Sequence, residues 1–166
     1  MSEINTWPGW ECVRLIGSGS YGKVYEIKKI EYGKTYTAAL KVITIPQNKA
    51  EINNAFDDGM DKESVTNYFR SFVDKIADEV ALMYDLKGYT NIVSYQDHKV
   101  IEHEDEIRWD ILIRMELLIP LQIYCNQKKL TEKEILKLGC DICRAIELCW
   151  KRKIVHRDIK PANIFI

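Results

Sequence analysis

The chain has 166 residues, of which 46% are hydrophobic and 30% charged, the composition of a globular protein. A chain of this length buries roughly 70% of its unfolded surface, enough for one ordinary domain. The net charge of −1 gives no basic field for nucleic acid, and no stretch reaches the ~20 apolar residues of a membrane-spanning helix. The first residues lack the regions of a signal peptide, and the five cysteines lack framework spacing, so we expect a cytoplasmic protein with reduced thiols.

Two strands joined by a glycine-rich turn are predicted near the start of the chain, over residues 10–16 and 23–28. The glycines of this turn, in the spacing G-x-G-x-x-G, are Gly17, Gly19 and Gly22. Glycine lets main-chain N–H groups approach phosphate oxygens without a Cβ in the way. The same spacing opens a helix in dinucleotide-binding proteins, but Val24 and the residues after it favour a strand.

A third strand is predicted over residues 35–45, after a turn at residues 31–34. Lys41 lies among its small and aliphatic side chains, and an unpaired buried ammonium costs several kcal/mol or more. A phosphate together with a carboxylate would compensate this charge, whereas a lysine on the exposed face of the strand would need neither. The polar residues 46–62 that follow predict a surface loop.

A helix is predicted from about residue 64 to residue 87, because apolar side chains recur at spacings of three and four. These side chains are Val65, Phe69, Phe72, Ile76, Val80 and Met83. Glu79 lies on or beside this apolar face, so its carboxylate calls for a cation, although it could also reach solvent at the edge of the face. Asp78 is the nearest alternative carboxylate.

Two more strands are predicted over residues 92–100 and 107–118, joined by a charged turn. His98 and His103 flank this turn, and without a paired ligand pattern both are expected at the solvated surface. A short helix is expected over residues 121–129. Thr131 and Glu134 then have the spacing of a capping box, which predicts the start of a longer helix. Its apolar stripe consists of Ile135, Leu138, Ile142, Ile146 and Cys149.

Residues 154–166 read as a polar loop between two apolar strands, an arrangement in which a scaffold can hold catalytic groups. The string from His156 to Asn163 resembles the catalytic loop H-R-D-x-x-x-x-N of protein kinases, with Asp158 and Asn163 in register. Lys160, two residues after the aspartate, resembles the serine/threonine-specific branch of that family. The glycine turn with Val24 resembles the kinase loop G-x-G-x-x-G-x-V, and the residues ending at Lys41 resemble the end of the family's V-A-I-K.

The resemblance implies an α+β fold in which a five-stranded antiparallel small lobe with one long helix spans about residues 10–118. The beginning of a helical large lobe then follows over residues 119–166. It implies ATP and Mg²⁺ as cofactors and a Lys41–Glu79 ion pair. It also implies Asp158 as the group that accepts or orients the proton of the attacking hydroxyl, Lys160 at the γ-phosphate and Asn163 as a Mg²⁺ ligand. It also implies nucleotide contacts from the glycine turn, from the second and third strands, from the segment after the fifth strand and from the end of the chain. These contacts are Ile16, Gly17, Gly19, Gly22, Val24, Ala39, Lys41, Met115, Glu116, Leu118 and Phe165.

The implied activity is transfer of the ATP γ-phosphate to serine or threonine hydroxyls of a protein substrate. The string stops before a D-F-G aspartate, so we expect the 166-residue chain alone to transfer phosphate poorly, and its helical stripe to favour self-association. The alternative is a non-catalytic nucleotide-binding or scaffold module of kinase descent. Retention of Lys41, Glu79, Asp158, Lys160 and Asn163 favours the enzyme, whereas the truncation favours the module.

Overall fold

The computed structural model describes residues 7–19 and 22–166, which form two compact units. The first unit contains the described residues up to Asp85 together with Tyr95–Leu117. The second contains Leu86–Ser94 and Leu118–Ile166. Each unit has its own organisation and is described by itself.

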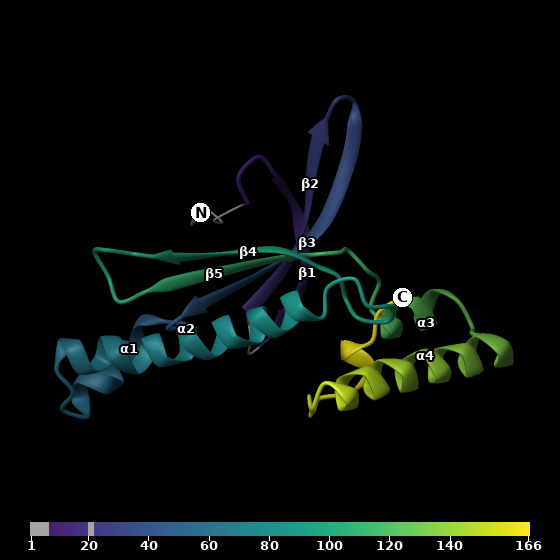
Figure 1. The fold of residues 1–166 in the computed structure, drawn as a ribbon. Helices are drawn as coiled ribbons and strands as arrows, with labels where there is room; N and C mark the ends of the chain where they lie inside the picture. The colour runs from purple at the N-terminus through teal and green to yellow at the C-terminus, as the bar shows by residue number, and fades with distance from the viewer. Residues whose placement is uncertain (1–6, 20–21) are drawn as a thin grey trace. The chain divides into compact units, whose positions relative to one another are not determined.

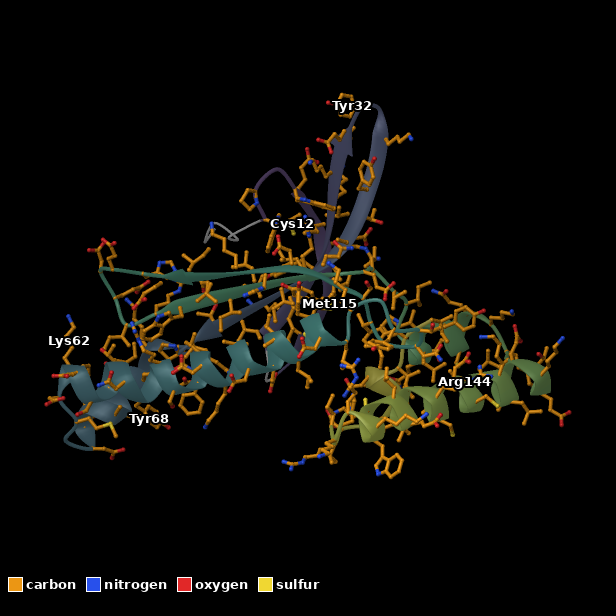
Figure 2. The ribbon with its side chains drawn as sticks, in the orientation of Figure 1. Cys12, Tyr32, Lys62, Tyr68, Met115 and Arg144 are labelled. Carbon is orange, nitrogen blue, oxygen red and sulfur yellow. The ribbon has the colours of Figure 1, made fainter. Side chains whose placement is uncertain are left out.

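The first unit is built on a five-stranded antiparallel sheet, as predicted (Figure 1), and its strand order is β1-β2-β3-β5-β4. Its strands are β1 (Glu11–Gly19), β2 (Gly22–Glu31), β3 (Lys34–Ile45), β4 (Tyr95–Glu102) and β5 (Trp109–Met115). β2 and β3 form a hairpin whose two turn residues, Tyr32 and Gly33, have positive φ angles of 50° and 73°. Such a turn matches the twist of the strands, and Figure 2 shows Tyr32 at the tip of the hairpin.

One face of the sheet is covered by α2 (Lys62–Asp85), the long helix expected from the apolar spacing (Figure 1). Val65, Phe69 and Val80 are buried there against Ile43, Ile111 and Ile113 of the sheet. Phe72, expected on the same apolar face, is 37% exposed, and its neighbour Val73 is buried instead. The other residues of the predicted stripe are in the core or packed against it, so Phe72 alone lies at the edge of the buried face, where its ring packs against Tyr68.

The prediction of a loop over residues 46–62 is wrong, because the segment contains a helix, α1 (Lys49–Asp57). The Asn48 side chain accepts a hydrogen bond from the Glu51 N–H at 3.2 Å, while Glu51 accepts one from the Gln47 N–H at 3.1 Å. Ala55 is buried, and Ile52 packs against the core beneath α2. Capping and tertiary packing therefore stabilise a helix whose polar composition gave no clear apolar stripe.

A buried carboxylate, Asp110, lies near the start of β5, next to the turn that joins β4 to β5. Asp110 of β5 is 1% exposed and accepts hydrogen bonds from the Thr44 hydroxyl at 2.7 Å and from Arg108 at 3.0 Å. His103 Nε2 lies 2.8 Å from Asp110 Oδ2, the oxygen to which Arg108 also donates. His103 is therefore half-buried in a polar network, and the expectation of a solvated surface residue holds only for His98.

The second unit contains α3 (Leu121–Gln127), α4 (Glu132–Lys151) and a 3₁₀ turn at Pro161–Asn163. The predicted capping box at the start of α4 is confirmed, with the Thr131 hydroxyl accepting from the Glu134 N–H and Glu134 accepting from the Thr131 N–H. The helical stripe is only partly covered: Cys149 is buried, whereas Ile135 is 54% and Ile146 44% exposed. Self-association through this helix remains a prediction.

Candidate functional site

The register of the sheet aligns four of the predicted site residues on the face that carries α2. Lys41 of β3 lies opposite Val24 of β2, and Ala39 lies opposite Met115 of β5. Directly paired residues, and residues two apart on one strand, share a face of a sheet. The sheet therefore places an aliphatic, a methyl and a thioether side chain on the same face as one ammonium, from the β2–β3 hairpin and from β5, which is distant in sequence.

The glycine turn connects β1 to β2 at the edge of this face. Its tip, residues 20 and 21, lies outside the described residues. Gly22 has a φ of +107°, and a Cβ there would stand 2.3 Å from the main-chain oxygen of Val42, so only glycine fits. Gly19 has open space around its Cα, and a Cβ on Gly17 would meet only Val24 at ordinary contact distance. Gly22 is thus required by the fold, whereas nothing in the described residues requires glycine at the other two positions.

Lys41 is half-buried, and this burial lowers the pKa of its ammonium, while the negative charge of Glu79 on α2 raises it in part. No ion pair or hydrogen bond joins the two side chains in the part of the chain that the structure describes. Glu79 is exposed on α2. The expected pair is thus present as a through-space interaction rather than as a salt bridge.

The loop before the end of the chain draws three polar side chains together in the second unit. Lys160 Nζ lies 2.9 Å from Asp158 Oδ1, and Asn163 Nδ2 donates to Asp158 Oδ2 at 2.7 Å. The same Asn163 nitrogen also donates to the main-chain oxygen of Asp158 at 2.9 Å. All three side chains are exposed, so the constellation is open to a substrate.

The hydrogen bonds from Lys160 and then from Asn163 lower the pKa of Asp158, and the charges of Lys160 and His156 act in the same direction. Asp158 is therefore an ionised acceptor at neutral pH. The preceding Arg157 has a φ of 62°, which turns the chain so that the Asp158 N–H reaches Nδ1 of His156 at 3.3 Å. Sequence reasoning missed this turn, because a left-handed arginine has no sequence signal.

Main-chain pairing holds the ends of this loop. Ile166 exchanges two hydrogen bonds with Ile119, at 2.8 and 3.0 Å, and Leu121 donates to Ile164 at 2.8 Å. Phe165 forms a bridge with Pro120 in the same ladder and is 40% exposed. The ladder therefore fixes the end of the loop to the segment that begins α3.

The predicted site residues are divided between the two units. The first unit carries Ile16, Gly17, Gly19, Gly22, Val24, Ala39, Lys41, Glu79, Met115 and Glu116; the second carries Leu118, Asp158, Lys160, Asn163 and Phe165. Figure 2 shows Met115 at the end of β5. A single site assembled from both groups remains a prediction.

The sheet, its long helix and the loop that follows are arranged in chain order like the N-terminal part of a protein-kinase-like fold. The chain belongs to the protein kinase domain family, whose sequence model matches residues 10–166. Within the described residues, no helix is long and apolar enough to cross a bilayer.

The similar proteins are protein kinases, two of which are named as serine/threonine kinases. The chain is 27% identical, over 94% of its length, to the serine/threonine-protein kinase AKL1 of Saccharomyces cerevisiae, and the match covers 14% of that protein. It is 33% identical to the serine/threonine-protein kinase ppk30 of Schizosaccharomyces pombe over 53% of its length and 10% of the relative. It is also 27% identical, over 95% of its length, to CBL-interacting protein kinase 20 of Oryza sativa subsp. japonica, with 29% of that protein covered. The chain thus spans less than a third of each of these relatives.

Proposed function

We propose that the protein containing this chain is an ATP-dependent serine/threonine protein kinase, which transfers the γ-phosphate of ATP to hydroxyl groups of a protein substrate. The observation that carries the proposal is the contact of Asp158 with both Lys160 and Asn163, at 2.9 and 2.7 Å. These contacts place an ionised carboxylate, an ammonium and a carboxamide within one exposed loop. Catalysis of phosphoryl transfer depends mostly on such positioning and charge stabilisation.

Asp158 accepts the hydrogen bond of the attacking hydroxyl in this proposal. Its lowered pKa makes it a weak proton acceptor before the reaction, so its first task is to orient the hydroxyl oxygen toward phosphorus. Lys160 lies against the same carboxylate and carries the positive charge that the γ-phosphate requires. The choice of serine or threonine as the acceptor rests on Lys160 and on the similarity of the chain to two serine/threonine-protein kinases.

The nucleotide is assigned to the α2-facing side of the sheet in the first unit. Val24, Ala39 and Met115, together with Ile16, would form apolar contacts with the adenine, and the main chain of Glu116 would bind its polar edge. Leu118 and Phe165 of the second unit remain expected contacts. The open space around Gly19 leaves room for phosphate oxygens. Lys41, whose burial lowers its pKa, gains a counter-charge when phosphate binds.

Asn163 fits a role as Mg²⁺ ligand. Its Nδ2 donates to two oxygens of Asp158, which leaves the carboxamide oxygen free of those bonds and fixes the side chain. Mg²⁺ prefers oxygen ligands and takes few of them from the protein, with phosphates and water supplying the others. The ion would neutralise charge on the phosphates.

The proposal is tested by titrating the purified chain with ATP in the presence and absence of Mg²⁺ by calorimetry. Lys41→Met is expected to weaken binding at least tenfold, while Lys34→Met, an exposed lysine on the same strand, leaves it unchanged. Phosphate transfer to a generic serine/threonine substrate is measured in parallel, with the longest form of the protein that can be expressed. Asp158→Asn in that same form is the control. A folded chain that binds no ATP would contradict the proposed nucleotide site.

A scaffold or nucleotide-binding module without catalysis is the second candidate. It is favoured by the separation of Lys41 and Glu79, which form no ion pair in the described part of the chain. Under this alternative, ATP binding persists but transfer is absent, and Asp158→Asn has no effect on any measured activity.

A further inference from the structure

Arg114 lies on the sheet face opposite to Lys41, and its guanidinium has an unusual environment. The group lies within cation–π distance of two indole rings, with Cζ 4.9 Å from the ring centroid of Trp7 and 5.0 Å from that of Trp10. Its Nε is buried and has no hydrogen-bond partner among the described residues. The guanidinium thus contacts two aromatic rings, and the described residues leave its Nε–H without an acceptor.

No carboxylate pairs with Arg114 in the described parts of the chain. The residue opposite it on β4 is Asp97, but the carboxylate of that residue accepts a hydrogen bond from the N–H of His98. Arg108, which precedes the same strand, also has a buried Nε without a partner, but its terminal nitrogens pair with Glu106 and Asp110. Asp97 thus places a negative charge on the same face of the sheet without forming an ion pair with Arg114. Because the guanidinium is partly buried, an anion in direct contact with it would compensate its charge more fully.

A hollow of about 290 Å³ adjoins this arginine. Trp10 and Tyr36 supply aromatic lining, and Lys29, Thr37 and Gln96 supply polar lining. Glu31 also lines the hollow, where its carboxylate lies 3.0 Å from Lys29 Nζ. The two cations outnumber this carboxylate, so the lining carries a net positive charge.

We propose that this hollow binds a small oxyanion, a phosphate group in the first place, through the N–H edge of Arg114 and the ammonium of Lys29. A guanidinium fork matches two oxygens of a phosphate, and the contacts with Trp7 and Trp10 restrict the position of the fork. The volume lies at the lower limit for small-molecule pockets, which suits a phosphate group rather than a whole nucleotide. The site lies on the other face of the sheet from Ala39 and Lys41, so it is separate from the proposed nucleotide site.

The indole N–H signals of Trp7 and Trp10 report directly on this site. The purified chain is titrated with inorganic phosphate at constant ionic strength, and ¹H–¹⁵N spectra follow its four tryptophans. Saturable shifts are expected for Trp7 and Trp10, with Trp109 and Trp150 unchanged. Arg114→Lys retains the charge but loses the planar fork, so it is expected to weaken binding about tenfold.

Adjacent lysines provide a matched pair of variants that leaves the tryptophan contacts intact. Lys29→Met is expected to weaken phosphate binding severalfold, whereas Lys28→Met leaves it unchanged, since successive strand residues point to opposite faces. The proposal would be overturned if phosphate caused no saturable shift, or if the two lysine variants lost phosphate affinity equally. These two tests remain valid if Arg114→Lys fails to fold.

A second titration with end-blocked phosphoserine distinguishes two sources of the phosphate group. Tighter binding of phosphoserine than of inorganic phosphate assigns the hollow to a phosphorylated side chain. Equal or weaker binding assigns it to a free anion. ATP binding is measured with the same variants and is expected to be unaffected by Lys29→Met, so failure of this site and failure of the proposed nucleotide site give different results.

Discussion

Asn163 holds Asp158 through one amide nitrogen, which donates both to the main-chain oxygen at 2.9 Å and to the carboxylate at 2.7 Å. Lys160 contacts the other carboxylate oxygen. Because these contacts come from residues two and five positions further along the chain, the loop forms its own polar constellation. The geometry of Asp158 is therefore set locally, by the second unit alone.

Replacing Lys160 with methionine is expected to raise the pKa of Asp158, because the hydrogen bond from Lys160 is the largest cause of its lowering. The carboxyl ¹³C signal of Asp158, followed against pH, measures the change. Glu147 serves as an internal control, since its own lowered pKa depends on Lys151. An unchanged titration of Asp158 in this variant would show that the Lys160 contact is not maintained in solution.

Gly22→Ala is expected to destabilise the first unit by about 1–3 kcal/mol or more, because alanine is strained at a φ of +107°. Its Cβ would also collide with the main-chain oxygen of Val42. Gly19→Ala should change the free energy of unfolding by less than about 0.5 kcal/mol, since the space there is open. Urea denaturation of the two variants measures both values. Equal stability of the variants would contradict the close approach of β2 to β3 at Gly22.

Removal of the Glu79 charge is expected to lower the pKa of Lys41 further. Burial already lowers this pKa, and the charge of Glu79 is the influence that opposes it. In Glu79→Gln, the amine of Lys41 should therefore become more reactive toward acylating reagents at a given pH, as measured by mass spectrometry. Asp78→Asn removes a charge from the neighbouring position of α2 and should leave the reactivity unchanged.

Asp110→Ala is expected to cost about 3 kcal/mol of unfolding free energy, because it removes hydrogen bonds to a buried charged group. Glu106→Ala removes the exposed partner of the same Arg108 and should cost less than about 1 kcal/mol. Denaturation curves of the two variants and the wild type give the free energy of unfolding that is lost in each case. The two losses compare the buried interaction of Asp110 with the exposed interaction of Glu106.

The same carboxylate predicts a dependence of stability on pH. Burial by itself raises the pKa of Asp110, but hydrogen bonds from Thr44, His103 and Arg108, with the charge of Arg108, outweigh it and lower the pKa. Its stabilising contribution is therefore present above the unfolded value of about 3.9 and is lost as the pH falls through the lower folded value. In Asp110→Asn, the free energy of unfolding should therefore fall less steeply below about pH 4 than in the wild type. An unchanged pH dependence would show that other carboxylates cause the loss of stability in acid.

Local sequence patterns predicted most of the elements of the fold. Five strands, the long helix and the capping box at Thr131 were readable because each depends on side chains that are close in sequence. The polar segment containing α1 was misread, since its stability comes from the Asn48 cap and from packing of Ile52 and Ala55 against a core built elsewhere. His103 was misplaced for the same reason, because its partner Asp110 became buried only in the assembled sheet.

The sequence by itself determined the order of the elements, the family and the grouping of Asp158, Lys160 and Asn163, because short loops fix the distances between neighbouring residues. Tertiary structure decided which residues meet across the sheet: Lys41 beside Val24, Gly22 against Val42, and Arg114 beside Trp7 and Trp10. Pairing register and burial are properties of the whole sheet. A periodic pattern gives the face on which a side chain lies, but only the packed strands determine its neighbours and therefore its charge environment.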